Sequence, residues 1–578
     1  MQFILLRVTR DTRWLVAAVV LTTIVSESAW AADLPRVGAR ASFTTHEAED
    51  ATTTGAVIRH EGWPKADVIT PELEASGRAF VRLARTGDHC DFTAKSAGDT
   101  LVIRHSSRDA DAGGGRDARL RLSVNGQFVR ELTISSKAGW LYGDHKSPGA
   151  GQSNNPSDGP PRHFWCDTPF WITDNPWRKG DVLRIENADD TSHVDIDLVD
   201  MELVPGANTP SRRRRWLSIV DFGATADDAS DDTVAIERCL LEAKAKEAGV
   251  WFPPGVFRHS RSFVVDGVAV EGAGLWRTSL IGAGEQLGFI LAGGSASVSH
   301  LSITSEVHTS RTDRGGIAFR SSLANDWRVE DIRVLNVNVG FWMSRTSRGV
   351  VRGCRAYCTN ADAINVNRNS RKILIENNFV RGAGDDGIAT LSESRDPEPT
   401  RDVVIRRNTV VANWWGHNID VAGGEGHVVE DNYLADNSHS ACIALNHPPA
   451  YPMHPLTGAL LRRNTIVRGG GNFARQRRGA IWTLSGKTTI TGVRFEENRL
   501  IEPMFRGLHL HGSGRQEIAF VGNQIVSPGG EVIRVDPEVH GKLVLRGNLV
   551  TQRLSDTPLI DNAAGEALDI AMSDDAWD

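Results

Sequence analysis

Short runs of alternating apolar and polar residues recur between residues 40 and 204. The clearest are Ala79–Leu83, Thr100–Arg104, Leu120–Val124, Val182–Ile185 and Val194–Leu198. Runs of this length, separated mostly by short turn-rich intervals, are typical of a β-sandwich. We therefore expect a β-sandwich domain over residues 40–204.

The pattern changes at residues 205–215, which contain two prolines and end in four consecutive arginines. A run of like charges is normally solvated surface, so this stretch predicts a linker. Beyond it, Asp231-Asp232-Thr233 precedes an amphipathic stretch over 234–247, which predicts a capped helix. We expect a second domain over residues 216–570.

From about residue 298 the chain repeats an apolar residue, two variable residues and an asparagine. The asparagines are Asn378, Asn408, Asn432, Asn464, Asn498, Asn523 and Asn548, and Cys354 stands at this position one repeat earlier. A period near 25 residues with short strands and loops of varying length predicts a right-handed parallel β-helix. The amides would form a ladder along the stack, and the helix over 234–247 would cap its N-terminal end. A leucine-rich solenoid is the main alternative, but its Leu-x-x-Leu-x-Leu pattern is missing.

Three aspartates stand out once the repeats are aligned. Asp362 lies eight residues after Cys354, and Asp386 lies eight after Asn378, so both occupy the same position on consecutive coils. Because parallel strands are about 4.8 Å apart, their carboxylates should lie side by side with Asp385 next to them. Their repulsion would raise at least one pKa, which supplies the acid that glycosidic cleavage needs beside an ionised base. A calcium site or a solvated acidic turn is the alternative.

Aromatic and polar residues follow on the next two coils. They are Trp414, Trp415, His417, Asp420, His439 and Tyr451. Such residues beside the acids would stack on sugar rings and hydrogen-bond hydroxyls. The pattern predicts a substrate-binding groove.

Composition narrows the class of ligand. The formal net charge of −7 over 578 residues removes the attraction that drives nucleic-acid binding. The 16 tryptophans permit carbohydrate stacking. The six cysteines, Cys90, Cys166, Cys239, Cys354, Cys358 and Cys442, show no zinc-ligand spacing, which leaves buried thiols or one or two disulfides.

The N-terminal segment has the pattern of an export signal. Arg7, Arg10 and Arg13 precede an apolar run over 14–25, and Ala29-Trp30-Ala31 follows as a cleavage site. We expect a signal peptide over residues 1–31 and a secreted mature chain that is free of the membrane. An uncleaved N-terminal anchor is the alternative.

The motifs Asn360-Ala-Asp362, Gly384-Asp-Asp386 and Gly416-His417 resemble the three-aspartate sites of polygalacturonase-type hydrolases. The offsets of 23 and 24 residues from Asp362 and the preceding sandwich are more similar to glycoside hydrolase family 87, the α-1,3-glucanases and mycodextranases. This resemblance implies an all-β chain, with a galactose-binding-like sandwich before a pectin-lyase-like β-helix.

The family resemblance also implies inverting endo-hydrolysis of α-1,3-linked glucan without a catalytic cofactor. Asp385 would protonate the leaving oxygen, and Asp362 and Asp386 would activate water. Polygalacturonases carry an Arg-x-Lys after the Gly-His pair to hold a uronate. None follows His417, which favours a neutral α-glucan as the partner.

The N-terminal module is similar to carbohydrate-binding modules of families 6 and 35. The resemblance implies a structural calcium ion at Glu47, Glu49 and Asp200, with Asp197 nearby. Two exposed acidic strand ends are the alternative.

Three other functions stay open. A mycodextranase would cleave alternating α-1,3/α-1,4-glucan, and a polysaccharide lyase would use the same scaffold on a uronate. A non-catalytic glycan-binding β-helix would use the aspartates to hold calcium. We expect a monomer in each case.

Overall fold

The computed structural model describes residues 37–62, 70–143, 153–189, 191–210, 215–282, 286–306, 316–448, 451–473, 476–553 and 557–577. The expected signal peptide and part of the expected linker, residues 211–214, lie outside this range. No helix among the described residues is long and apolar enough to cross a bilayer.

Residues 44–202 form two antiparallel sheets that enclose one apolar core, as the alternating pattern predicts. One sheet has the order β11-β6-β13-β4-β3, with β1 also paired to β13, and the other has the order β2-β5-β12-β7-β8. The strands are β1 Thr44–Glu47, β2 Thr52–Thr53, β3 Ala56–Arg59, β4 Ala79–Leu83, β5 His89–Thr93, β6 Thr100–Ser107, β7 Asp117–Val124, β8 Gln127–Ser135, β11 Cys166–Trp171, β12 Val182–Asn187 and β13 Val194–Glu202. A short helix, α1 Pro71–Glu74, and a hairpin of β9 Trp140–Tyr142 and β10 Pro161–His163 extend from this sandwich.

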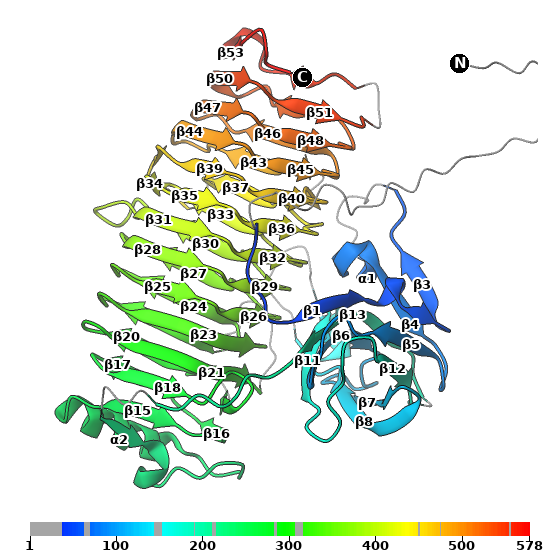
Figure 1. Ribbon diagram of the computed structural model, residues 1–578. Helices are drawn as coiled ribbons and strands as arrows, with labels where there is room; N and C mark the ends of the chain where they lie inside the picture. The colour runs from blue at the N-terminus through cyan, green and yellow to red at the C-terminus, as the bar shows by residue number, and fades with distance from the viewer. Residues whose placement is uncertain are drawn as a thin grey trace, which may run out of the picture. The chain divides into compact units, whose positions relative to one another are not determined.

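From β14 onward the chain winds into a right-handed parallel β-helix whose coils stack from β15 to β53 (Figure 1). One face is a 12-stranded parallel sheet. Its strands are β17 Phe263–Asp266, β20 Phe289–Ala292, β22 Ile317–Ser322, β24 Val339–Ser344, β27 Ile364–Asn367, β30 Ile388–Leu391, β33 Ile419–Ala422, β37 Ile443–Asn446, β43 Gly479–Leu484, β46 Arg506–His511, β49 Ile533–Val535 and β52 Ile560–Asn562.

The remaining faces of the coils form a second, bent parallel sheet of 26 strands. They are β14 Trp216–Ser218, β15 Gly249–Phe252, β16 Gly255–His259, β18 Ala269–Gly272, β19 Thr278–Gly282, β21 Ser297–Ser305, β23 Arg328–Leu335, β25 Val350–Arg352, β26 Arg355–Tyr357, β28 Arg371–Glu376, β29 Phe379–Arg381, β31 Arg401–Arg406, β32 Thr409–Val411, β34 Gly424–Glu425, β35 Val428–Glu430, β36 Tyr433–Ala435, β38 Leu456–Thr457, β39 Leu460–Arg462, β40 Thr465–Val467, β44 Ile490–Glu496, β45 Arg499–Ile501, β47 Arg515–Val521, β48 Gln524–Val526, β50 His540–Arg546, β51 Leu549–Thr551 and β53 Leu568–Met572.

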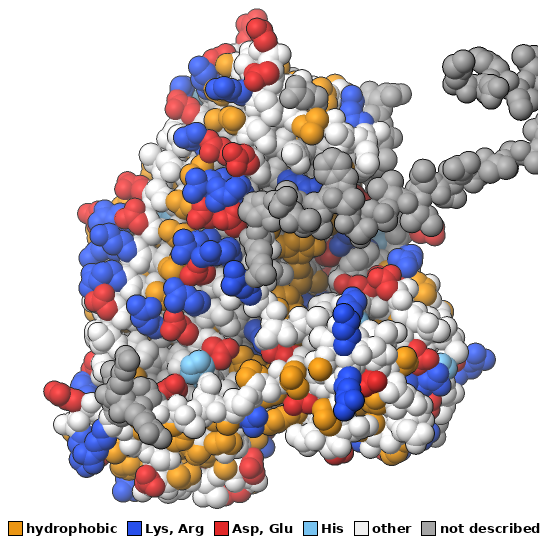
Figure 2. All heavy atoms as spheres, viewed as in Figure 1, with side chains coloured by type: hydrophobic (Ala, Val, Ile, Leu, Met, Phe, Trp, Pro, Cys, Tyr) orange, Lys and Arg blue, Asp and Glu red, His pale blue; other side chains and the backbone are white. Residues whose placement is uncertain are grey.

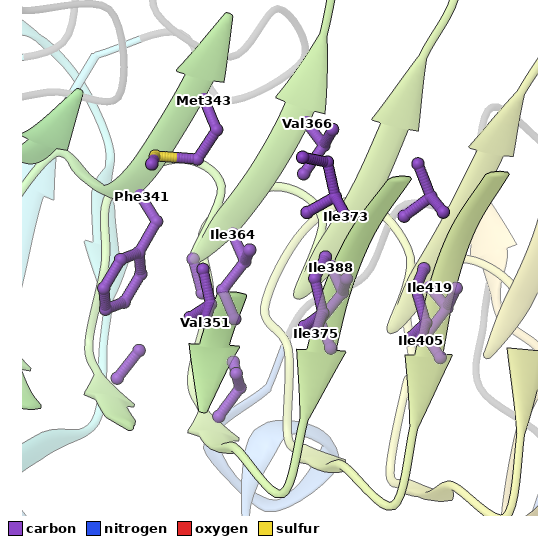
Figure 3. Close-up of a cluster of buried hydrophobic side chains, with 14 of the residues drawn as sticks. Phe341, Met343, Val351, Ile364, Val366, Ile373, Ile375, Ile388, Ile405 and Ile419 are labelled. Carbon is purple, nitrogen blue, oxygen red and sulfur yellow. The ribbon is translucent and has the colours of Figure 1, made fainter. Parts of the chain in front are cut away.

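Buried aliphatic side chains fill the inside of the solenoid, one above the other. Ile364, Ile388 and Ile419 pair in register across β27, β30 and β33, and Ile375 and Ile405 pair across β28 and β31 (Figure 3). Each coil covers the apolar side chains of the coil before it. The first and last coils have a neighbour on one side only, so the two ends of the solenoid need a cap. The helix α2 Thr233–Ala245 packs against β14, β15 and β17 and supplies the N-terminal cap, one residue from its expected start.

The repeated asparagines form the expected ladder. Asn432 Nδ2 donates to Asn464 Oδ1 at 2.9 Å and to the Ile405 carbonyl at 3.0 Å, and the same Asn464 oxygen accepts the Asn432 backbone N–H at 3.1 Å. Cys354 takes the first position, where its N–H donates to Asn378 Oδ1 at 2.9 Å. All six cysteines are buried free thiols, so the expectation of thiols holds and none is paired.

Charged side chains of both signs intersperse along the outside of the solenoid (Figure 2). Many are paired between coils: Arg352 bridges Glu330 at 3.0 Å and Glu376 at 3.1 Å. Exposed pairs of this kind contribute little each.

Buried ion pairs connect the sandwich to the solenoid. Arg355 of β26 contacts Glu202 of β13 at 2.7 Å. Arg381 of β29 contacts Asp200 at 2.8 Å and also Asp167, and all three side chains are at most 1% exposed. Loss of one partner would leave a buried charge without compensation, so these contacts hold the two modules together.

We predict that Asn464→Ala lowers the free energy of unfolding by about 2–4 kcal/mol, because it leaves the Asn432 amides without their acceptor and the Val429 carbonyl without its donor. Urea unfolding followed by circular dichroism measures this loss. The control Asn562→Ala removes a hydrogen bond to the Gly565 carbonyl and one from the Ala564 N–H, both at the surface end of the solenoid, and should cost less than about 1 kcal/mol. Equal losses in the two variants would contradict a structural role for the ladder.

Candidate active site

The three expected carboxylates meet at one place on the 12-stranded face. Asp362 precedes β27 and Asp386 precedes β30, and these strands pair from Ile364 and Ile388 onward. Oxygens of Asp362, Asp385 and Asp386 all lie within 4.8 Å of one another. The one-coil offset therefore places the aspartates side by side.

Hydrogen bonds fix two of the three carboxylates as acceptors. The Asp386 backbone N–H donates to Asp362 Oδ1 at 3.0 Å, and Asn365 Nδ2 donates to Asp362 Oδ2 at 2.7 Å. His417 donates to Asp386 Oδ1 through its backbone N–H at 2.8 Å and its Nδ1 at 2.9 Å. Each of these carboxylates accepts two donors and is therefore held in one orientation.

Two glycines let the next coil approach the acids. Gly416 has a φ of +53°, and a side chain there would lie 2.7 Å from Asp385 Oδ1. A side chain at Gly384 would lie 2.2 Å from the Trp414 ring and 2.3 Å from the Asn360 carbonyl. Any other residue would push the coils apart at the acids, which explains the glycines in these two motifs.

The aspartates lie in a groove of about 620 Å³. Trp415, His417, Asp420, His439 and Tyr451 line it, as the sequence predicts. Its walls come from insertions that lengthen individual coils: Glu393 from one, Tyr451 and Met453 from a second, and Phe473 and Arg478 from a third. These loops fall in the three longest intervals between ladder asparagines.

One wall of the groove is aromatic. Trp415 stacks on His439 with ring centroids 3.9 Å apart, and Phe473 lies 4.5 Å from His439 and 5.2 Å from Trp415. Tyr451 is 62% exposed at the rim. Flat faces of this kind suit the apolar faces of sugar rings.

Two titratable side chains that line the groove, Asp420 and Arg478, have shifted pKa values. Burial, and then the neighbouring Asp386, raise the pKa of Asp420 well above its usual value. Burial lowers the pKa of Arg478 to about 10, against the opposing effect of Asp420. Arg478 also covers the Trp482 ring at 4.0 Å and donates to Ser440 Oγ at 2.6 Å.

Trp414 differs from its expected place, because it does not line the groove. Its ring contacts the sandwich instead, with the Phe164 ring centroid at 4.7 Å and the Arg162 guanidinium at 5.2 Å. The two tryptophans are adjacent in a bend between β32 and β33, and only Trp415 lines the groove.

The expected calcium residues of the sandwich divide into two groups. Asp200 forms an ion pair with Arg381 at 2.8 Å and accepts a hydrogen bond from the Thr45 hydroxyl at 2.6 Å. Its charge is therefore balanced by Arg381. Glu47 and Glu49 lie instead beside the Ser76–Gly77 turn: Ser76 Oγ donates to Glu47 at 2.9 Å and its N–H donates to Asp197 at 3.0 Å. Burial raises the pKa of Glu47 and of Glu49 to about 7.

A second titratable cluster lies on the coils beyond the groove, where His509, His511 and Asp536 meet. Asp536 accepts from His509 Nε2 at 2.9 Å, from His511 Nδ1 at 2.8 Å and from Arg534 Nε at 2.9 Å. The negative charge is balanced inside the cluster, which needs no further cation.

Sequence reasoning missed Asn365, Phe473, Arg478 and Trp482 in the site. Asn365 could have been predicted from the repeat. It lies three residues after Asp362, and it occupies the same position on its coil as Ala389 and the groove residue Asp420 on the next two coils. Phe473 lies in a short hairpin and Arg478 directly follows it, inside the longest interval of the repeat. The length of that interval was the one sequence signal of a functional insertion.

Comparisons with known proteins agree with this geometry. Residues 41–204 match the family model of the alpha-1,3-glucanase catalytic domain D1, and residues 216–441 match the pectate-lyase-like model of rhamnogalacturonase A and epimerases. No curated protein sequence matches the chain.

Solved structures share the fold over nearly the whole chain. The Agl-KA catalytic domain has a TM-score of 0.83 at 20% identity and covers 94% of this chain and 100% of its own. A GH87 α-1,3-glucanase catalytic domain in complex with nigerose has a TM-score of 0.74 at 21% identity, covering 93% and 99%. The thermostable α-1,3-glucanase of Streptomyces thermodiastaticus strain HF3-3 has a TM-score of 0.76 at 24% identity, covering 94% and 98%.

The D1 module, the pectate-lyase-like solenoid and the grouped carboxylates define a glycoside hydrolase built on a parallel β-helix. Among these enzymes, the chain is similar to the α-1,3-glucanases of glycoside hydrolase family 87, in the matched D1 module and in the fold.

We predict that Asp420→Asn stabilises the protein more at pH 7.5 than at pH 4.5. Because the folded protein raises the pKa of Asp420, it binds more protons than the unfolded chain above the unfolded value, so wild-type stability falls as pH rises through this window. The asparagine cannot ionise and avoids that loss. Thermal unfolding at both pH values measures the difference. The exposed control Asp117→Asn should show no such trend, and a pH-independent difference for Asp420→Asn would contradict the burial argument.

Proposed function

We propose that the mature chain is a secreted, endo-acting hydrolase of α-1,3-glucosidic bonds in α-glucan, with inversion at the anomeric carbon. The observation that carries the proposal is the group of Asp362, Asp385 and Asp386 in the groove, with all three carboxylates within 4.8 Å. The D1 match and the α-1,3-glucanases that share the fold support the linkage, since one of those enzymes was solved with nigerose and with tetrasaccharides.

The solved complexes also support the choice of residues. Four of them are GH87 α-1,3-glucanase catalytic domains with a single aspartate-to-alanine substitution, and these substitutions fall at three positions. Two of the substituted positions are adjacent, and the third lies 23 residues before the first of them. Asp362, Asp385 and Asp386 have the same spacing.

The hydrogen bonds support a division of roles. Asp362 and Asp386 accept donors from Asn365, His417 and the backbone, which suits carboxylates that take a proton from water. Asp385 is the least buried of the three and would give its proton to the glycosidic oxygen. As that C–O bond breaks, the water oxygen bonds to the anomeric carbon from the opposite side, and its proton passes to the Asp362–Asp386 pair.

The carboxylate spacing bears on stereochemistry. Retaining glycosidases separate their two carboxyl groups by about 5–5.5 Å and inverting ones by about 6.5–9.5 Å. Taken alone, contacts within 4.8 Å favour a carboxylate nucleophile. We propose inversion because two carboxylates are held together as acceptors, which fits a shared water better than a single nucleophile, and because the family resemblance implies it.

The groove favours a neutral sugar. Its arginine, Arg478, packs over the Trp482 ring and donates to Ser440 Oγ, so its guanidinium is already engaged within the protein. The stacked Trp415 and His439 offer apolar surface. These features suit glucose units better than a uronate. Alternating α-1,3/α-1,4-glucan would present the same surfaces, so nigeran is the second candidate substrate.

We predict that Asp385→Asn, Asp386→Asn and Asp362→Asn each lower kcat on insoluble α-1,3-glucan by about 10²–10⁴-fold, because each removes an acid or base function. Product sizing by chromatography measures release, and early oligosaccharides of several lengths would indicate endo-action. Binding of α-1,3-linked oligosaccharides should persist. Asp402→Asn is the matched control, since Asp402 is an exposed aspartate of the same solenoid.

Other outcomes would favour other functions. Nigeran hydrolysed faster than α-1,3-glucan would indicate a mycodextranase, and ultraviolet-absorbing products from polygalacturonate would indicate a lyase. Binding of glucan without release by the wild type would favour the non-catalytic alternative. Full activity in the Asp385 and Asp386 variants would contradict the proposed roles.

We also propose a structural calcium ion in the sandwich, held by Glu47, Glu49 and Asp197. Glu47 and Glu49 each have a buried Oε2 atom without a hydrogen-bond partner, and carboxylate oxygens are the ligands calcium prefers. Asp197 replaces Asp200 in this set because Ser76 contacts both Asp197 and Glu47, although Arg104 also contacts Asp197 at 2.6 Å. The ion would offset the buried charges and take no part in catalysis.

We predict that EDTA lowers the melting temperature of the wild type by several degrees and that calcium restores it, since bound ions stabilise the folded state. Glu49→Gln should have a lower melting temperature already and respond less to EDTA. The rate of hydrolysis at a temperature far below melting should not change. A melting temperature that ignores EDTA would contradict the calcium site, and rapid loss of activity without unfolding would indicate a catalytic metal.

Export and a monomeric state complete the proposal. Residues 1–31 would be removed during secretion, which N-terminal sequencing of the exported protein would detect.

A further inference from the structure

A continuous set of contacts runs from the sandwich to the acidic motif of the solenoid. It begins at Glu74 of α1, whose carboxylate binds Arg162 of β10 through two bonds of 2.9 and 2.6 Å. Both side chains are at most 5% exposed. This buried pair fixes the guanidinium in one place, because a planar fork matches a carboxylate in one geometry.

Arg162 and Phe164 then hold Trp414 of the solenoid. The guanidinium lies 4.5 Å from the Phe164 ring and 5.2 Å from the Trp414 ring, and it donates to the Trp414 carbonyl at 3.4 Å. The Phe164 and Trp414 rings meet edge to face at 74° with centroids 4.7 Å apart. Both the ring and the backbone of Trp414 are therefore in contact with the sandwich.

On its other side Trp414 lies over the acidic motif. Its backbone N–H donates to the Ala383 carbonyl at 3.0 Å, and its ring leaves no room for a side chain at Gly384. Asp385 follows directly. The chain on both sides of Trp414 also contacts Asp385: Asn413 donates to its carbonyl at 3.3 Å, and Gly416 lies against it.

We propose that Phe164 and Arg162 are positioning residues for hydrolysis: they press Trp414 onto Gly384 and so hold Asp385 in line with the scissile bond. The sandwich thus completes the catalytic site from outside the groove. This inference rests on the proposed role of Asp385 as the general acid.

The proposal accounts for two observations together. Trp414 is adjacent to the groove residue Trp415 yet faces the sandwich. A buried arginine and a buried phenylalanine of the sandwich contact this one loop of the solenoid. The modules are also joined elsewhere, where the Phe43 and Phe379 ring centroids lie 5.0 Å apart.

The test compares Phe164→Leu and Trp414→Leu with Phe43→Leu. The first two remove a ring from the Trp414 contact, and the control removes a ring from a contact of the same kind that does not involve Trp414. Arg162 is left in place, because its loss would strand Glu74 and risk unfolding. Kinetics use reduced α-1,3-linked gluco-oligosaccharides.

We expect Phe164→Leu and Trp414→Leu to lower kcat about 10- to 100-fold, with KM changed by less than about threefold, because the acid is misplaced while the groove remains. The basic limb of the pH profile of kcat should move to lower pH, since water admitted beside Asp385 favours its ionised form. The double variant should lose little more than either single variant. Trp414→Phe should recover most of kcat, and Phe43→Leu should lower only the melting temperature.

Hydrogen exchange gives a readout that does not need activity. Peptides that contain Gly384 to Asp386 should exchange faster in Phe164→Leu than in the wild type and be unchanged in Phe43→Leu. Unchanged exchange, or a wild-type kcat and pH profile in Phe164→Leu, would overturn the positioning role. A wild type that releases nothing from any α-glucan would overturn the proposed function and the catalytic part of the inference, and faster exchange would then leave a purely structural contact.

Discussion

The amide ladder at one bend of the solenoid fixes the register on which the site depends. Each ladder asparagine after Asn378 accepts the backbone N–H and the side-chain amide of the preceding one, as Asn464 does for Asn432. A buried polar group is costly without its partners, so slipping one coil against the next would break several such bonds at once. With the register fixed, equal distances along the chain become equal positions in space, and Asp362 and Asp386 meet across one strand spacing.

The rest of the site is added to this regular frame. Insertions in the longer coils raise the walls of the groove, with Phe473 and Arg478 on one of them. The buried pairs Arg381–Asp200 and Arg355–Glu202 hold the sandwich against the solenoid. Contacts through Arg162 and Phe164 then extend the influence of the sandwich to Trp414, beside the acids.

The parts predicted from sequence are those that the repeat determines. The ladder, the replacement by Cys354 and the grouping of the three aspartates follow from spacing alone. The helix that caps the solenoid follows from a local pattern. The orientation of Trp414 could not be predicted, since it depends on Phe164, which lies about 250 residues away in the sequence. Asp200 was expected at a calcium ion, and its partner Arg381 belongs to the other module. Contacts between the sandwich and the solenoid do not produce a periodic pattern in the sequence.

The central claim is that three grouped aspartates hydrolyse an α-1,3-glucosidic bond by a single displacement. Proton NMR of the first product released from α-1,3-linked oligosaccharides tests it most directly, because the anomer is recorded before mutarotation. The account predicts the β-anomer as the initial product. An initial α-anomer would contradict it, since one of the aspartates would then act as a nucleophile, as the carboxylate spacing alone suggests.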